Sequence, residues 1–240
     1  MICRMEKTIR ITPSMCDNTK KLGVPNIFAL FMDLASEHGQ DIGLGADRLE
    51  KLNLLWLTVK TKIHIVKLPD MLDTVTAVTW PEKAGKIRCN RFYALYSEGE
   101  LLVEGKTEWA IFDMQSGKLY KAADELWKGV KFCEDTVCNE PFERISEDFA
   151  NAVKLCSYTV KSTDIDLGQH MNNAAYPRAI FGAFTCKQRE AFNVKDMDIV
   201  FRTPCFEGTD LDIVVREGDG FTDIGVLLPD GKAAAVARIK

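Results

Sequence analysis

Histidine is scarce in this chain, which contains only His38, His64 and His170 among its 240 residues. None of the three is spaced from another as zinc ligands are, so the sequence disfavours a zinc hydrolase and predicts no metal site. His64 alternates with Ile63 and Ile65 in a strand-like run, and His38 lies late in a helix-like run, so both are expected to be structural. His170 remains as the candidate for chemistry near neutral pH.

Long hydrophobic runs and Cys-x-x-Cys pairs are also missing. No stretch approaches the roughly 20 apolar residues of a membrane span, and Arg4, Glu6, Lys7 and Arg10 leave no apolar core for a signal peptide. The cysteines are scattered, which predicts reduced thiols rather than a disulfide framework. We therefore expect a cytoplasmic protein without a membrane span. The eight cysteines are Cys3, Cys16, Cys89, Cys133, Cys138, Cys156, Cys186 and Cys205.

The chain has no excess of positive charge. Its 31 Lys and Arg residues stand against 35 Asp and Glu residues, a net charge of −4, and no basic run is present. This balance argues against binding to nucleic acid. It also means that an acidic protein partner would have to dock through a local patch of cations, because the overall field does not attract it.

A dense group of polar side chains lies at 162–176, on the approach to an apolar helix. Asp166 can orient a base or accept a proton, and histidine, here His170, is the side chain most often used as a general base near neutral pH. Asn172 and Asn173 can cap the helix, whose free N–H groups would face a developing oxyanion. Asp164 is expected to form a turn. Together these residues point to acyl-transfer chemistry.

The pattern Asp-x-x-x-His-x-Asn-Asn followed by an aromatic residue resembles the active-site segment of the acyl-acyl-carrier-protein (acyl-ACP) thioesterases, which have the hotdog fold. The resemblance extends over roughly residues 5 to 240. It implies two hotdog units in one chain, each a long helix wrapped by a curved antiparallel sheet, and hydrolysis of the thioester between a fatty acyl chain and its carrier protein. Further matching segments are 55–65, 69–75, Trp80 with Gly85-Lys86, and 104–110.

The chain departs from the plant members of that family at two positions. Gly168 stands where they have an asparagine, and Pro204 precedes Cys205 where they have a Glu-Cys pair. Asp166 and His170 are the residues that match. The resemblance makes Cys205 a candidate nucleophile, with a small buried packing residue as the alternative, since a thiolate needs an activating partner.

Hydrophobic periodicity predicts an α+β fold with an internal repeat. A helix is expected at 25–41 and a second one from about Asn173 to Ala191, with Pro177 in its opening turn. Shifting the sequence by 136 residues superimposes the two halves, which favours a duplicated unit. The strands are expected at 55–67, 73–80, 86–97, 100–113, 118–121, 194–203, 209–217, 220–228 and 232–239.

These elements divide the chain into a first unit at 1–121, a charge-rich linker at 122–151 with a short helix near 122–128, and a second unit at 152–240. Only the second unit has the His-Asn-Asn cluster, so the first is expected to bind the acyl chain, as the resemblance implies. The candidate lining is Ile27, Phe28, Phe31, Met32, Leu54 and Trp56.

Two mechanisms are compatible with the sequence. His170 and Asp166 could activate a water molecule, or Asp166 could attack the thioester directly, with helix-start amides near Asn172 and Asn173 binding the oxyanion. Asn172 could alternatively serve only as a cap. Neither mechanism needs an organic cofactor, because a thiolate is a good leaving group.

Several functional alternatives stay open at this point. They are an acyl-CoA thioesterase, a hotdog hydratase or dehydratase, and a non-catalytic acyl-binding protein. The sequence also leaves open whether the chain works alone or as a homodimer. Candidate cations for docking the carrier protein are Lys161, Arg178, Lys187, Arg189 and Arg202.

Overall fold

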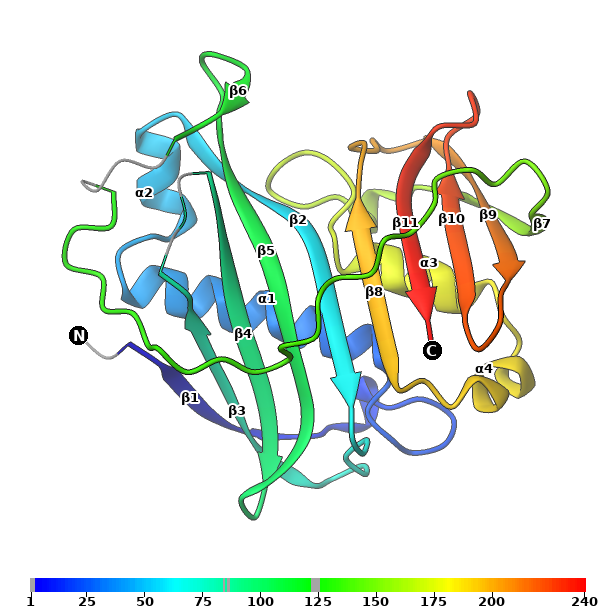
Figure 1. Ribbon diagram of the computed structural model, residues 1–240, viewed down its shortest axis with the longest axis horizontal. Helices are drawn as coiled ribbons and strands as arrows, with labels where there is room; N and C mark the ends of the chain where they lie inside the picture. Colours follow the sequence, from blue (N-terminus) through cyan, green and yellow to red (C-terminus); the bar gives the residue numbers. More distant parts are fainter. Residues whose placement is uncertain (1–2, 84, 86, 122–125) are drawn as a thin grey trace.

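One antiparallel sheet runs through the whole protein. The computed structural model describes residues 3–83, 85, 87–121 and 126–240, and within these residues the sheet has eleven strands in the order β1-β3-β4-β5-β2-β8-β11-β10-β9-β7, with β6 paired to β5 (Figure 1). The strands are β1 (Met5–Arg10), β2 (Leu54–Ile65), β3 (Thr74–Pro81), β4 (Arg88–Ser97), β5 (Glu100–Asp113), β6 (Lys118–Leu119), β7 (Val153–Thr159), β8 (Asp196–Phe201), β9 (Asp210–Glu217), β10 (Thr222–Leu227) and β11 (Ala233–Ile239).

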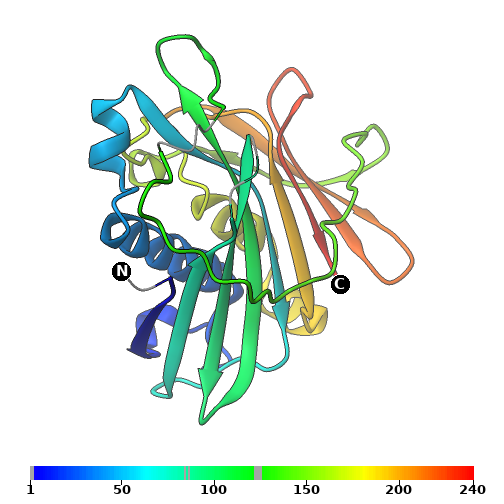
Figure 2. The same cartoon turned by 60° about the vertical axis from the view of Figure 1, so that its left-hand side comes forward.

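The helices pack against one face of this sheet (Figures 1 and 2). Helices α1 and α3 contact each other, and their apolar side chains share one core with the inner faces of both halves of the sheet. None of the helices among the described residues is long and apolar enough to cross a membrane. The helices are α1 (Val24–Asp41), α2 (Ala46–Lys51), α3 (Ala175–Gly182) and α4 (Cys186–Phe192), with the short 3₁₀ turns η1 (Pro13–Met15) and η2 (Ser162–Asp164).

Helix α1 is the centre of the first half, and its predicted position is confirmed. Pro25 lies in its first turn, where a missing N–H costs nothing, and Gly43 with φ of +73° follows its end. The ring of Phe31 is fully buried and stacks on Tyr93 with centroids 4.3 Å apart. Burying such a ring contributes about 1.5–3 kcal/mol. The close approach depends on Gly105, where a Cβ would lie 2.4 Å from the Phe31 ring.

The helical region of the second half differs from the prediction. A single helix over 173–191 was wrong, because the structure has two helices separated by residues 183–185. Thr185 and Gln188 form a reciprocal capping box: Gln188 N donates to Thr185 Oγ1 at 3.3 Å, and Thr185 N donates to Gln188 Oε1 at 2.9 Å. This cap starts a new helix, so the single long helix that the apolar spacing suggested is interrupted here.

The predicted strands are confirmed to within a few residues, and two edge strands were missed. β1 and β7 lie at the two ends of the sheet and carry mostly exposed or half-buried residues, so they lack the alternation of a half-buried strand. The short helix expected near 122–128 lies partly outside the described residues. Its described part, 126–128, lies in a turn.

The strand order shows the internal repeat. Read outward from the centre, the first half runs β2-β5-β4-β3-β1 and the second half runs β8-β11-β10-β9-β7. The central strands β2 and β8 pair antiparallel, with Lys62 opposite Asp198. These two residues are 136 positions apart, the same offset that superimposes the halves, so they mark the local two-fold axis that relates them.

The segment between the halves crosses the sheet on the face opposite the helices (Figures 1 and 2). Its backbone binds polar side chains of that face: Glu143 N donates to Asp198 Oδ1 at 3.1 Å, and Lys62 Nζ donates to Pro141 O at 3.3 Å. Under this cover Lys62 and Asp198 form an ion pair at 2.9 Å, with side chains 5% and 2% exposed. The segment therefore covers the buried ion pair at the junction of the two halves.

The expectation of eight free thiols was wrong, because Cys3 and Cys133 form a disulfide. They are 130 residues apart, so no local spacing could have signalled the pair. The fold brings them together: Trp80 Nε1 donates to Asp135 O at 2.8 Å, and the Arg4 guanidinium lies 4.3 Å from the centre of the Trp80 ring. The N-terminal segment and the linker thus meet at the same strand.

Candidate active site

The polar segment before α3 folds into a tight hairpin. Ile165 and Met171 form an isolated β-bridge, Asp166 N donates to His170 O at 3.1 Å, and Gln169 N donates to Asp166 O at 3.0 Å. Gln169 takes a left-handed conformation, with φ of +60°, to close the turn. The hairpin brings Asp166 and His170 face to face. In an extended chain, two residues four positions apart would lie too far from each other to do so.

The two side chains form the predicted pair at a distance longer than a hydrogen bond. His170 Nδ1 lies 3.9 Å from Asp166 Oδ1, and both side chains are partly exposed. Asp166 Oδ1 is held by the Gly168 amide at 2.8 Å. A contact of this length can close to a hydrogen bond when substrate binds, since catalytic hydrogen bonds are often long without substrate.

Gly168 lies between the pair. A Cβ at this position would be 2.9 Å from His170 Nε2 and 3.1 Å from Asp166 Oδ1. A side chain here would therefore contact both candidate catalytic groups. The glycine leaves this space open beside the imidazole, whose side chain is partly exposed.

Asp164 forms the expected turn and also anchors the hairpin. Its buried carboxylate accepts hydrogen bonds from Lys161 N at 2.8 Å and from the Tyr158 hydroxyl at 2.6 Å, and its carbonyl accepts Asn172 N at 2.8 Å. Burial, and then the bond to Asp164, raises the pKa of Tyr158 to about 12. The sequence pattern does not indicate Tyr158, because this contact joins an edge strand to the loop.

The amides at the start of α3 are mostly occupied. Asn172 Oδ1 accepts from Ala174 N, and Asn172 O accepts from Ala175 N, both at 2.8 Å. The Asn172 side chain thus binds an amide in the turn that precedes α3, and the N-cap residue of α3 itself is Ala174. Of the four amides at 172–175, all described, only that of Asn173 makes no hydrogen bond to the protein. Its N–H is therefore the one of these four that is not used within the described part of the protein.

Cys205 lies beside the hairpin in the core. Its carbonyl accepts Met171 N at 2.7 Å, while the side chain is only 1% exposed. Burial raises the pKa of the Cys205 thiol, and its contact with the Tyr176 hydroxyl offsets this only in part. Within the described residues no hydrogen bond joins Cys205 to His170. This environment favours a packing role over a nucleophile.

The predicted acyl-chain residues fall into two groups in the first half. Ile27, Phe28 and Phe31 are buried on α1 in the main core, and Met32 packs at its margin. Leu54 and Trp56 on β2 belong to a second apolar cluster near the end of α1, where Trp56 Nε1 donates to Leu44 O at 2.9 Å. Thr58 lies between the groups, with its Oγ1 4.0 Å from Met32 Sδ.

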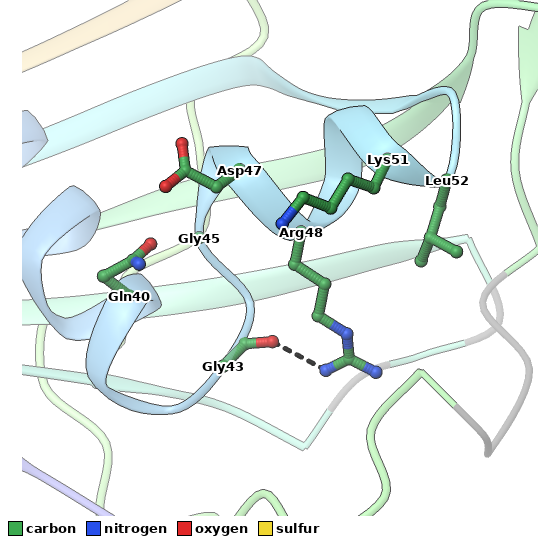
Figure 3. Close-up of a pocket in the computed structure, with 7 residues that line it drawn as sticks. All are labelled: Gln40, Gly43, Gly45, Asp47, Arg48, Lys51 and Leu52. Atoms are coloured by element: carbon green, nitrogen blue, oxygen red, sulfur yellow. Dashed lines mark hydrogen bonds between the residues drawn. The ribbon is translucent and has the colours of Figure 1, made fainter.

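A surface pocket of about 390 Å³ lies elsewhere, where α1 turns into α2 (Figure 3). Arg48 crosses it and donates to Gly43 O at 2.6 Å. None of the predicted site residues lines this pocket, so it is separate from the Asp166–His170 hairpin. Its lining is Gln40, Gly43, Gly45, Asp47, Arg48, Lys51 and Leu52.

Solved structures share this architecture over its full length. A 12:0-ACP thioesterase from Umbellularia californica superimposes with a TM-score of 0.89 at 17% identity, covering 100% of this chain and 97% of that chain. An acyl-ACP thioesterase from Bacteroides thetaiotaomicron gives 0.87 at 17% identity, covering 98% and 96%. The fold is therefore the tandem hotdog that the sequence predicted.

Sequence comparison gives the family. Residues 4–130 match the acyl-ACP thioesterase N-terminal domain and residues 148–231 match the C-terminal domain, so the chain belongs to the acyl-ACP thioesterase family. An oleoyl-acyl carrier protein thioesterase of Coriandrum sativum is 26% identical over 175 residues, 65% of this chain and 47% of the relative. An oleoyl-acyl carrier protein thioesterase of Arabidopsis thaliana is 23% identical over 207 residues, which are 78% of this chain and 55% of the relative. The chain thus spans about half the length of these curated relatives.

Proposed function

We propose that this protein hydrolyses the thioester of fatty acyl-ACP, releasing a free fatty acid and holo-ACP. The observation that carries the proposal is the facing pair of Asp166 and His170 in a tight hairpin before α3, in a chain of the acyl-ACP thioesterase family. The names of the relatives support the same substrate class. ACP is then the partner that delivers the acyl chain.

In the proposed reaction His170 takes a proton from a water molecule as its oxygen attacks the thioester carbonyl. Asp166 holds the imidazole and stabilises its charged form. The carbonyl oxygen becomes negative and accepts a hydrogen bond from the Asn173 amide, with the Asn172 side-chain amide as a second donor. The C–S bond then breaks, and His170 returns the proton to the leaving thiolate.

The alternative chemistry uses Asp166 as the nucleophile. Its carboxylate would form an anhydride with the acyl group and expel the thiolate, and water would then cleave the anhydride. The bond from Gly168 N to Asp166 Oδ1 favours the first mechanism, because it orients the carboxylate and reduces its nucleophilicity. Hydrolysis in ¹⁸O-water under single-turnover conditions separates them, since only the anhydride route can leave label on Asp166.

We propose a division of labour between the halves. Residues 1–121 bind the acyl chain, residues 152–240 hold the reacting groups, and residues 122–151 connect them. Burial of each methylene contributes about 0.8 kcal/mol, so chain length is selected by where the apolar interior of the first half is blocked. The candidate lining is Ile27, Phe28, Phe31, Met32, Leu54 and Trp56.

The test is an assay of purified protein with acyl-ACPs of graded chain length, following free thiol and free fatty acid. We expect hydrolysis, and we expect His170→Ala and Asp166→Ala each to lower kcat by roughly two orders of magnitude or more while the protein stays folded. Near-normal turnover in either variant would move the chemistry elsewhere. Lys67→Glu, an exposed change outside the hairpin, is the matched control.

The same assay distinguishes the alternatives. Faster release from acyl-CoA than from acyl-ACP would indicate an acyl-CoA thioesterase, and water addition to an enoyl substrate would indicate a hydratase. Binding without turnover would indicate a non-catalytic acyl-binding protein. A homodimer and a cytoplasmic location stay predictions, which sedimentation of the purified protein and fractionation of cells measure directly.

A further inference from the structure

Two large apolar side chains are exposed beside the proposed site. Leu167, between Asp166 and Gly168 at the tip of the hairpin, is 93% exposed, and Phe206, directly after Cys205, is 57% exposed. The bond from Met171 N to Cys205 O joins their two loops. Single exposed apolar residues are ordinary on a protein surface, but these two flank the groups that would meet a substrate.

Two cations lie next to the same loops. Lys161 follows Val160, and the backbone of Val160 pairs with the turn after Phe206. Val160 N donates to Thr209 O at 2.9 Å, and Gly208 N donates to Val160 O at 3.0 Å. Arg178 on α3 is close enough to Tyr158 to lower its pKa by its charge. Both are exposed, and neither forms an ion pair within the described part of the chain.

The other candidate docking cations are less suited to this task. Arg202 pairs with Glu147 at 2.8 Å, and Arg189 donates to Asn18 at 3.3 Å and to Cys186 at 3.3 Å. Lys187 lies on α4, beyond the break that separates α4 from α3. Lys161 and Arg178 are therefore the cations that combine free charge with proximity to the hairpin.

We propose that Leu167, Phe206, Lys161 and Arg178 form the docking surface for an acidic carrier protein. The proposal rests on the proposed function, because the carrier must place its thioester at His170. Desolvated apolar side chains supply most of the affinity in such interfaces, and cations speed the encounter with an acidic partner. A local patch is required here, since the chain's own net charge of −4 repels an acidic partner overall.

The experiment compares two substrates with the same acyl group, oleoyl-ACP and the oleoyl thioester of N-acetylcysteamine, which has no carrier protein. Phe206→Ser and Lys161→Glu should each lower kcat/KM for oleoyl-ACP about tenfold through KM, and leave the small thioester within about twofold. The loss in Lys161→Glu should shrink in high salt, whereas that in Phe206→Ser should persist. Glu207→Lys, which removes a negative charge next to Phe206, should lower KM for oleoyl-ACP.

Two controls match these changes. Val153→Ser removes an apolar residue that is 65% exposed on β7, and Lys67→Glu reverses an exposed charge in the first half. Both should behave as wild type with both substrates. An equal loss on both substrates in the test variants, or a loss of the same size in the controls, overturns the docking surface.

Direct binding separates this proposal from the proposed function. The Kd of non-acylated holo-ACP, measured by fluorescence anisotropy, needs no catalysis and should rise about tenfold in Phe206→Ser and Lys161→Glu. If the wild type hydrolyses the small thioester but these variants bind holo-ACP normally, the docking surface is wrong and the function stands. If the variants lose binding to holo-ACP but the wild type hydrolyses neither substrate, the surface stands and hydrolysis is wrong.

Discussion

Removing one hydroxyl from Tyr158 tests how the catalytic hairpin is held in place. Tyr158→Phe keeps the ring on β7 and deletes the O–H that donates to Asp164 at 2.6 Å. Among the residues that the structure describes, the buried carboxylate then retains only the bond from Lys161 N, at 2.8 Å. Because the Asp164 carbonyl also holds Asn172, the loss acts on the segment between η2 and α3, which contains Asp166 and His170.

The magnitude follows from the charge and burial of the acceptor. A hydrogen bond to a charged group contributes about 1.5–3 kcal/mol, and we expect Tyr158→Phe to lower the free energy of unfolding by about 2 kcal/mol. Its neighbour supplies a matched control: Thr159 Oγ1 donates to Asp210 at the same 2.6 Å, but that pair is exposed. Thr159→Val should cost no more than about 0.5 kcal/mol.

Urea unfolding followed by tryptophan fluorescence measures both variants, and an unchanged m-value shows that stability alone has changed. The raised pKa of Tyr158 adds a pH test. The neutral phenol is favoured in the folded state. The stability that Tyr158 contributes to the fold is therefore complete below its unfolded pKa of about 10, and it is lost as the pH rises through the folded pKa of about 12. Equal costs for the two variants, or a Tyr158→Phe cost that grows with pH above about 10, would refute the reasoning.

Two further predictions concern the second half. Cys205→Ala should keep at least roughly a tenth of the activity, because a packing residue takes no part in bond making; complete inactivation with intact folding, or a trapped acyl-cysteine, would identify a nucleophile. Burial raises the pKa of Asp223, but hydrogen bonds from Arg238 at 2.7 Å and Arg216 at 2.8 Å outweigh it and lower the pKa overall. Asp223→Asn should therefore cost about 3 kcal/mol of unfolding free energy at neutral pH, and the difference from wild type in urea unfolding should shrink as the pH falls below about 4 and be lost only as the pH falls through the lowered folded-state pKa of Asp223.

Elements with a strong local pattern could be predicted from the sequence. Helix α1 is apolar on most sides and has Pro25 in its first turn, so its position follows from spacing and proline chemistry. Elements whose stability comes from residues distant in the sequence could not be predicted in this way. The edge strand β1 is mostly exposed and is held by its ladder to β3, and the Cys3–Cys133 disulfide depends on the meeting of two remote segments. The break between α3 and α4 did have a local signal, the Thr185–Gln188 capping box.

The candidate site shows the same division. Asp166 and His170 are four residues apart, so a turn suffices to bring them together, and the sequence predicts the pair. The state of the helix-start amides depends on where Asp164 and the Asn172 side chain point, which spacing does not specify. Three of the four amides at 172–175 are occupied, and Tyr158 anchors the loop because the fold places β7 beside it.

The Lys62–Asp198 pair has a consequence for how the chain assembles as it is made. In a dimer of identical units a residue on the two-fold axis meets its own copy, so it cannot form an ion pair with itself. Once two units are fused in one chain, the two copies of the position can acquire opposite charges, as they have here. Two first halves from neighbouring nascent chains, joined through β2 in this register, would bury Lys62 against Lys62, and two second halves would bury Asp198 against Asp198. Pairing of like halves in this register would therefore oppose like charges, whereas the two different halves bring opposite charges together.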